Sequence, residues 1–251
     1  MRKELLASLS MIGSLAAAGA AAAQTCATPP SCETLGFTKS EADCDGLEAL
    51  KCPFDQSKLY CPQGGGNMSA AAPGAILYSD GTISDSVIAS KTPVGIVAYV
   101  NGSTGFAVAL TESSQTWGGS GYNVSCLGDM DSGAASADMN GRVNTQCLVS
   151  DSQTHPAANY CNTFSAVSSG KGSSGWYLPA AGELKAMSYS YGAINLGLQK
   201  LSKTQISSSY YWSSSESPNY GYHAWVVRPS DGYMTDLNRD NSYRVRCVLA
   251  L

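Results

Sequence analysis

The sequence has few charged residues and almost no histidine. Charged side chains make up 14% of the 251 residues, and the two histidines are His155 and His223. Two histidines are too few for the usual histidine-based zinc centre of three or four ligands. A phosphate-binding Walker loop and a dinucleotide-binding glycine fingerprint are also missing. We therefore expect neither a bound metal nor an organic cofactor.

Basic residues are scarce and scattered. The chain has 15 Lys and Arg against 19 Asp and Glu, a net charge of −4 at pH 7. Without residues 1–23, which hold Arg2, Lys3 and Glu4, the counts are 13 and 18, and the net charge is −5. A protein that binds nucleic acid through its phosphates needs clustered positive charge. We therefore expect no nucleic-acid partner.

Long apolar runs are absent after residue 23. The first 23 residues combine a basic start at Arg2 and Lys3, an apolar stretch over 5–18 and an A-x-A sequence at 21–23. This order is typical of a secretory signal peptide. A membrane anchor is disfavoured, because the apolar stretch is short and rich in alanine and glycine. We expect a secreted protein, extracellular or on the cell surface, with the periplasm as the alternative and no membrane span in the mature chain.

All nine cysteines lie beyond this segment. Export favours disulfides over metal ligation, and an odd count predicts a thiol that is free or that bridges to another chain. Five of them lie in a segment too short to fold by apolar burial alone: Cys26, Cys32, Cys44, Cys52 and Cys61. We predict a disulfide-stapled module over 24–62. Zinc is the competing interpretation, but the segment has no C-x-x-C pair and no histidine.

Residues 63–73 are rich in glycine and alanine and predict a flexible linker before a main domain over 74–251. Residues 74–84 predict a strand, a turn and a strand. The β-branched and aromatic runs 94–100 and 106–111 flank an Asn-Gly turn and predict a hairpin. Polar residues 112–175 predict long surface loops held by cysteines. Within them Asp129 and Asp131 have calcium-loop spacing, but Gly133 and the missing terminal glutamate favour an ordinary turn.

The last quarter of the chain predicts two helices followed by strands. Apolar residues recur at helical spacing from Leu184 to Leu201, with a break expected at Gly192. Strands are expected at 224–228, 233–237 and 243–251. In the last strand, alternation predicts one buried face, with Arg244 and Arg246 on the opposite face.

A cluster of polar residues near the C-terminus raises the question of catalysis. Ser213, Ser214 and Ser215 lie beside Glu216 and a short distance before His223. A serine hydrolase needs a nucleophile, a base and an orienting acid. The segment has no G-x-S-x-G elbow and no strand-to-helix turn. We expect no enzyme, and a secreted hydrolase using Glu216, Ser214 and His223 is the alternative.

Several motifs, taken in order, resemble those of the Lcl C-terminal domain family, also known as DUF1566. They are "ILYSDGT", "VGIVAYV", "WYLPAAGEL", "YYWSSSE", "AWVV" and "YRVRCVLAL". The resemblance covers about 74–251. The residues that match its helix-entry and strand motifs are Trp176, Leu178, Pro179, Glu183, Leu184, Trp212, Ser213, Ser214 and Glu216.

This resemblance implies an α+β fold, a formylglycine-generating-enzyme-type variant of the C-type lectin-like fold, with short antiparallel strands, two helices and long loops. It also implies disulfides between Cys161 and Cys247 and between Cys126 and Cys147. Domains of this family are found on bacterial surface proteins and adhesins, so the resemblance implies ligand attachment, such as the binding of sulfated polysaccharide by a collagen-like adhesin. The chain lacks the E-P-N, Q-P-D and W-N-D motifs of calcium-dependent lectins and the reactive cysteine pair of formylglycine-generating enzymes.

The fold implied by this resemblance divides the C-terminal segment into residues that form the scaffold and residues that face solvent. Trp212, Trp225, Val226, Val245 and Cys247 are expected to face inward, and the residues between them to face solvent. Tyr, Asn, Ser, Asp and Arg form a mixture typical of binding surfaces. The predicted ligand contacts are Asn219, Tyr220, Tyr222, His223, Arg228, Asp231, Tyr233, Asp236, Asn238, Arg239, Asp240 and Tyr243.

We expect the partner to be a protein or a glycan on a host or bacterial surface. Two alternatives remain: ordinary polar loops, and a pilus or matrix subunit joined by an intermolecular disulfide. Residues 217–243 contain no Lys, Glu or Gln. In this they resemble the variable region of diversity-generating retroelement target proteins, where adenine-directed mutagenesis avoids these residues.

Overall fold

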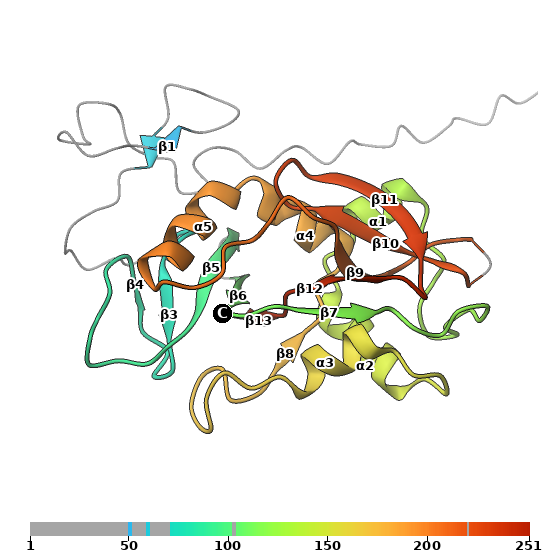
Figure 1. Cartoon of the computed structure of the whole chain (residues 1–251), viewed down its shortest axis with the longest axis horizontal. Helices are drawn as coiled ribbons and strands as arrows, with labels where there is room; N and C mark the ends of the chain where they lie inside the picture. The colour runs from blue at the N-terminus through green and yellow to red at the C-terminus, as the bar shows by residue number, and fades with distance from the viewer. Residues whose placement is uncertain (1–49, 52–58, 61–70, 102–103, 220) are drawn as a thin grey trace, which may run out of the picture.

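The computed structural model describes residues 71–101, 104–219 and 221–251, together with a short antiparallel pair, β1 (Leu50–Lys51) and β2 (Leu59–Tyr60) (Figure 1). The predicted signal peptide, most of the cysteine module and linker, and Tyr220 lie outside the described residues. In the part described, the fold is mixed α+β, with two larger sheets and five helices. No helix of that part is long and apolar enough to cross a membrane.

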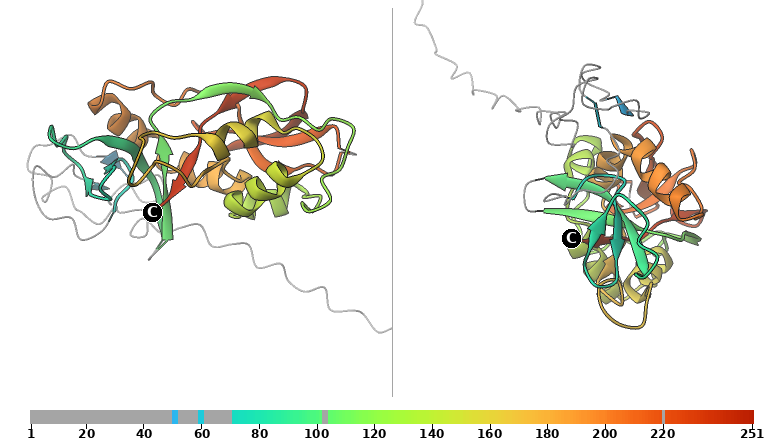
Figure 2. Two further views of the ribbon diagram at one scale, coloured as in Figure 1. Left: turned by 90° about the horizontal axis from the view of Figure 1, so that it is seen from below. Right: turned by 90° about the vertical axis from the view of Figure 1, so that its left-hand side faces the viewer.

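The six-stranded sheet occupies one end of the long axis of the molecule (Figures 1 and 2). Its order is β4-β3-β5-β6-β13-β8. The bounds are Ile76–Tyr78 for β3, Ile83–Ser84 for β4, Pro93–Asn101 for β5, Thr104–Ala109 for β6, Trp176–Tyr177 for β8 and Val248–Ala250 for β13. The two hairpins predicted over 74–84 and 94–111 are confirmed, β3 with β4 and β5 with β6.

The five-stranded sheet lies at the other end, in the order β11-β10-β9-β12-β7. The bounds are Ser113–Thr116 for β7, Tyr211–Glu216 for β9, His223–Arg228 for β10, Tyr233–Asn238 for β11 and Ser242–Val245 for β12. The strands predicted at 224–228 and 233–237 are confirmed as β10 and β11, which form a hairpin in a register that places His223 opposite Asn238 and Arg228 opposite Tyr233. Directly opposed residues share a face of a sheet, so this register sets which side chains meet.

The final strand predicted over 243–251 is wrong as a single element. The chain leaves the five-stranded sheet after Val245 and enters the six-stranded sheet at Val248. The change of sheet turns Arg246 inward, where its Nη2 donates to the carbonyl of Thr204 and the guanidinium pairs with Glu112. Arg244 is half-exposed. Alternation predicts faces only while a strand stays in one sheet.

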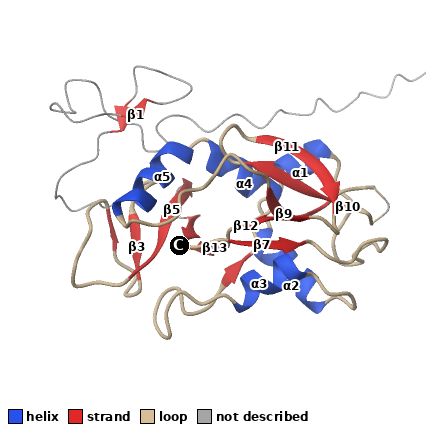
Figure 3. Cartoon of the chain, in the orientation of Figure 1, coloured by secondary structure: helices blue, strands red, loops and turns tan. Residues whose placement is uncertain are grey.

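The prediction of loops over 112–175 is wrong where this segment forms regular secondary structure, which is in less than half of its length. This segment holds β7 and three helices, α1 (Ser132–Ala137), α2 (Gly141–Ser150) and α3 (Pro156–Thr163) (Figure 3). Their buried faces are made largely of small residues, such as Ala135, Ala157 and Ala158. Such faces give only a weak apolar periodicity, so tertiary packing decides these helices.

The two helices predicted near Leu184 and Leu198 are confirmed as α4 (Ala181–Ser188) and α5 (Tyr191–Lys200). The break lies at 189–190, just before the expected Gly192. Glu183 fixes the start of α4, because its Oε2 accepts from the Ala180 amide at 2.8 Å. Helices α4 and α5 are the two that were expected, and α1, α2 and α3 are additional. The described part of the chain therefore has five helices instead of two.

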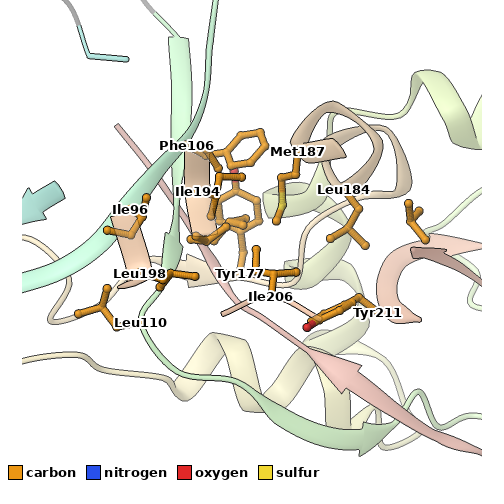
Figure 4. Packing of buried hydrophobic residues seen from close by; sticks show 14 of the residues in the cluster. Ile96, Phe106, Leu110, Tyr177, Leu184, Met187, Ile194, Leu198, Ile206 and Tyr211 are labelled. Atoms are coloured by element: carbon orange, nitrogen blue, oxygen red, sulfur yellow. The ribbon is translucent and has the colours of Figure 1, made fainter. Parts of the chain in front are cut away.

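Two hydrophobic clusters hold the domain together. One lies between the six-stranded sheet and the helices α4 and α5, where Ile96 and Phe106 meet Leu184, Met187 and Ile194 (Figure 4). The other lies under the opposite faces of both sheets, against α2 and α3. The five-stranded sheet is therefore covered on one side by α1 and α4 and on the other by α2 and α3 (Figure 1).

Two disulfides connect these layers. Cys161 of α3 is bonded to Cys247, which follows β12, and Cys126 is bonded to Cys147 of α2. These are the pairings that the family resemblance implied. The second bridge fastens the loop that follows β7 to α2, and this loop contributes to the surface described below.

Candidate ligand-binding surface

The frame of the surface is strand β9, whose six residues are all buried. Both faces of the strand are covered, so its serines serve as internal polar contacts. Ser213 Oγ donates to the carbonyl of Trp225 at 2.7 Å, and Ser215 Oγ donates to Asp138 at 2.7 Å. Trp212 and Trp225 are buried as expected for scaffold positions.

Arg239 is a correction to the predicted set of ligand contacts. Its side chain is fully buried, and its Nη2 donates to Glu216 Oε1 at 2.5 Å. The guanidinium also lies 4.3 Å from the centre of the Trp117 ring. A buried charge is tolerated only when it is paired and hydrogen-bonded, and this one is both. Arg239 therefore belongs to the scaffold.

Glu216 is the acid of this buried pair. It also accepts from the amide of Val124 at 3.2 Å, and its carbonyl accepts from the amide of Met130 at 3.2 Å. Burial raises the pKa of the Glu216 carboxyl, and the hydrogen bond from Arg239 opposes that shift. The pair joins β9, the end of β11 and the loop that precedes α1.

The residues of the hydrolase alternative do not meet in a relay. Glu216 is engaged by Arg239, and His223 Nδ1 lies 3.0 Å from Asp236 Oδ2. Ser214 Oγ is buried and has no hydrogen-bond partner among the residues that the structure describes. The serine, histidine and glutamate of that hypothesis therefore have separate environments.

The predicted contacts other than Arg239 and the undescribed Tyr220, together with Tyr122 and Tyr210, fall into two groups at opposite ends of the β10–β11 hairpin. The turn-end patch consists of Tyr210, Arg228, Asp231, Tyr233 and Tyr243. The open-end patch consists of Tyr122, Asn219, Tyr222, His223, Asp236, Asn238 and Asp240. Five residue steps separate His223 from Arg228, about 17 Å along a strand.

The turn-end patch is a row of aromatic rings. The Tyr233 ring centre lies 6.3 Å from that of Tyr210, which lies 6.2 Å from that of Tyr243, and Tyr243 in turn packs 5.1 Å from buried Trp212. The guanidinium of Arg228 lies 5.2 Å from the Tyr233 ring centre, and its Nε and Nη2 donate to the two carboxylate oxygens of Asp231. The row thus runs from the core to Tyr233, which is 51% exposed.

The open-end patch is organised by Asp236. Its Oδ2 accepts from Ser217 Oγ at 2.8 Å, from Asn219 Nδ2 at 2.9 Å and from His223 Nδ1 at 3.0 Å. Partial burial opposes ionisation, but these three hydrogen bonds outweigh it and lower the pKa of the Asp236 carboxyl. Asp236 is therefore an anion at neutral pH. Ser217, expected at the surface, is buried beneath it.

Asp131, considered above for calcium, caps a helix. Its Oδ1 accepts from the amide of Ala134 at 2.8 Å, at the start of α1. Within the described ranges, no group of three His, Cys, Asp or Glu residues is arranged to hold a metal ion.

Two residues of these patches were missed by sequence reasoning. Tyr210 immediately precedes the Tyr-Trp pair of the β9 motif, and its place beside Tyr243 depends on the parallel pairing of β12 with β9. Tyr122 lies between Gly121 and Asn123 in a loop without periodicity, and its amide donates to the carbonyl of Gly119. Tyr210 had a local signal in the sequence, because it lies beside a motif. Tyr122 had no such signal.

The fold and this surface define a disulfide-linked α+β domain that displays tyrosines on a buried polar frame. The Lcl C-terminal domain family matches residues 113–249, which is more than half of the chain. The chain belongs to this family, as its motifs indicated. Strands β3 to β6 precede the matched residues.

One solved structure shares the fold at low sequence identity. It is a fimbrial protein from Bacteroides ovatus ATCC 8483, with a TM-score of 0.53 and 20% identity. The match covers 70% of this chain and 48% of that protein, so this chain spans about half of its length. A comparison with curated proteins found no match.

Proposed function

We propose that this protein is a secreted or cell-surface binding protein, adhesin-like and without catalytic activity, whose turn-end patch contacts a protein or glycan ligand. The observation that carries the proposal is the row of rings from Trp212 to Tyr233. Membership of the Lcl C-terminal domain family and the fold shared with a fimbrial protein support a role at the cell surface.

The physical argument rests on pre-organisation. Tyrosine offers a large amphipathic contact area with few rotatable bonds, and each ring of the row is supported by the next. Arg228 is held over two rings by Asp231, so it also loses little freedom on binding. Side chains that are exposed and already ordered are typical of binding hot spots.

The finer assignment of the fold is part of this proposal. We propose a C-type lectin-like arrangement of the formylglycine-generating-enzyme type, supported by the mixed α+β sheets and by the long loop that Cys126 and Cys147 fasten. An experimental structure superposed on domains of that type tests it, and a different strand connectivity would overturn it.

We also propose that residues 217–243 are diversified. The support is that solvent-facing Asn219, Tyr222 and Tyr233 lie in a segment without Lys, Glu or Gln. A genome in which no reverse transcriptase gene and no template repeat lie near this gene would contradict it.

The binding proposal is tested with the full chain. A glycan array and an array of immobilised extracellular proteins are probed with the wild type and with Tyr210→Ala/Tyr233→Ala/Tyr243→Ala. We expect the triple variant to lose the signals of the wild type. The control is Val143→Ala, because Val143 is 68% exposed on α2 and belongs to neither patch. Equal signals from the folded triple variant and the wild type would refute the proposal.

A further inference from the structure

The open-end patch joins two loops that are far apart in sequence. The amide of Gly121 donates to the carbonyl of Gly221 at 2.9 Å, and the Tyr222 ring lies over Gly121. A Cβ on Gly221 would lie 2.5 Å from the backbone of Tyr122, so the two loops are in direct contact. Tyr122 and Tyr222 are nevertheless 43% and 54% exposed. In Figure 1 the loops lie beyond the arrowhead of β11.

Arg239 holds both loops from below. Its Nη1 donates to the carbonyls of Tyr122 at 2.8 Å and Gly119 at 3.3 Å, and its Nε donates to the carbonyl of His223 at 3.0 Å. The amide of Arg239 also donates to the carbonyl of Tyr222 at 3.0 Å, so hydrogen bonds from one buried residue hold the backbone at both exposed tyrosines. Binding to an ordered surface costs less conformational entropy.

The charge at this end is of one sign. The segments 118–131, 217–223 and 236–241 contain Asp129, Asp131, Asp236 and Asp240. They contain no lysine, and their one arginine is the buried Arg239, which is already paired with Glu216. His223 is the remaining titratable group that faces Asp236, and its Nδ1 is engaged there. What the patch offers to solvent is therefore aromatic rings with carboxylates.

That combination selects a cationic partner. Lysine and arginine side chains bind over tyrosine rings through the ring quadrupole and pair with carboxylates at the rim. We propose that the open-end patch, through Tyr122, Tyr222, Asp236 and Asp240, docks a lysine- or arginine-bearing segment of a partner protein. This site lies at the opposite end of the hairpin from the turn-end patch and does not depend on the function proposed for that patch.

The test uses fluorescence polarisation of labelled peptides with the full chain. The probes are nine-residue peptides of alternating Lys and Gly or Arg and Gly, with an alternating Glu and Gly peptide as the charge control. We expect the basic peptides to bind more tightly than the acidic control. Their binding should weaken as the salt concentration rises. Tyr122→Ala/Tyr222→Ala and Asp236→Asn/Asp240→Asn should each weaken binding by about tenfold.

The matched control is Tyr210→Ala/Tyr233→Ala, which removes rings at the turn end and should leave peptide binding unchanged. If Tyr122→Ala/Tyr222→Ala fails to fold, Tyr122→Leu/Tyr222→Leu keeps the apolar bulk and removes the aromatic ring. Basic peptides that bind no better than the acidic one, or that bind the Asp236→Asn/Asp240→Asn variant as well as the wild type, would overturn the proposal. Loss of a glycan signal in the Tyr122 and Tyr222 variants, without peptide binding, would assign the patch to a glycan and also overturn it.

Discussion

The two ends of the β10–β11 hairpin use the same residue types for different purposes. Arg228 at the turn end and Arg239 at the open end each pair with an acid and each lie against an aromatic ring. Arg228 and Asp231 are exposed to solvent, where an ion pair contributes little to stability. Arg239 and Glu216 are fully buried, where breaking the pair leaves an uncompensated charge. Arg228 is part of the turn-end patch, whereas Arg239 supports the open-end patch from the interior without being part of it.

At each end of the hairpin, the exposed side chains are positioned by supporting residues, which are called the frame here. At the turn end the frame is a row of rings in tilted and edge-to-face contact that ends on Trp212. At the open end it is a buried ion pair beneath two loops, and a disulfide that fastens the loop of Tyr122 to α2. Substitutions of exposed residues should therefore affect binding, and substitutions of the frame should affect folding.

Arg239→Ala should give the largest loss of stability. It leaves Glu216 buried without its cation, and we expect a loss of about 3–5 kcal/mol in the free energy of unfolding. Urea denaturation followed by tryptophan fluorescence measures this. Arg228→Ala is the matched control, with a much smaller change expected because its partner remains in water. Equal losses for both variants would break the distinction between the two ends.

Removal of the Cys126–Cys147 bridge should be the next largest effect. The cysteines are separated by 21 residues, and chain entropy predicts a loss of about 3 kcal/mol for Cys126→Ser/Cys147→Ser. The same denaturation assay applies. Because the bridge fastens the loop of Tyr122, proteolysis in residues 118–131 should also become faster, with cleavage sites read by mass spectrometry. Unchanged stability together with unchanged cleavage would contradict a role in the open-end frame.

Glu183 provides a buried acid to compare with Glu216. Burial raises its pKa to about 7, against hydrogen bonds from Ala180 and Tyr177 that lower it. Its protonated form is therefore favoured in the folded protein. The protonated Glu183 therefore contributes to the free energy of unfolding. This contribution is fully present below about pH 4.5 and is lost as the pH rises through 7, and it amounts to about 3 kcal/mol.

The measurement is the free energy of unfolding from pH 4.5 to 8 for the wild type and for Glu183→Gln. Gln stays neutral and keeps one acceptor, so the variant should lack this pH dependence. Other carboxyls titrate in both proteins and cancel in the difference. Parallel pH profiles for the two proteins would contradict the assigned pKa.

Tyr233→Ala and Tyr222→Ala should give the smallest stability effects and the sharpest separation in binding. Both side chains are more than half exposed, so we expect changes within about 0.5 kcal/mol in unfolding free energy. Tyr233→Ala should weaken array binding by about tenfold and leave basic-peptide binding intact, and Tyr222→Ala should do the reverse. Loss of both activities in either variant would merge the two patches into one site.

Local patterns were sufficient for several elements of this fold. The Asn-Gly hairpin of β5 and β6, the β10–β11 hairpin and the pair α4 and α5 follow from periodicity and turn residues within short windows. They could be predicted because each element's signal lies in its own residues. Helices α1, α2 and α3 could not, since their buried faces carry small residues such as Ala135 and Ala158. Their stability comes from packing and from the disulfides of Cys147 and Cys161.

The ordered motifs are sufficient to identify the family, and the residue composition is sufficient to predict a surface rich in tyrosine and poor in lysine. Tertiary structure alone decided which residues reach that surface. Arg239 and Arg246 read as solvent-facing in the sequence, but long-range partners on Glu216 and Glu112 bury both. The loops of Tyr122 and Tyr222 are distant in sequence and are joined by the hydrogen bond from Gly121 to Gly221. Residue spacing records neighbours along the chain, whereas burial and charge pairing depend on contacts that form only when the whole chain has folded.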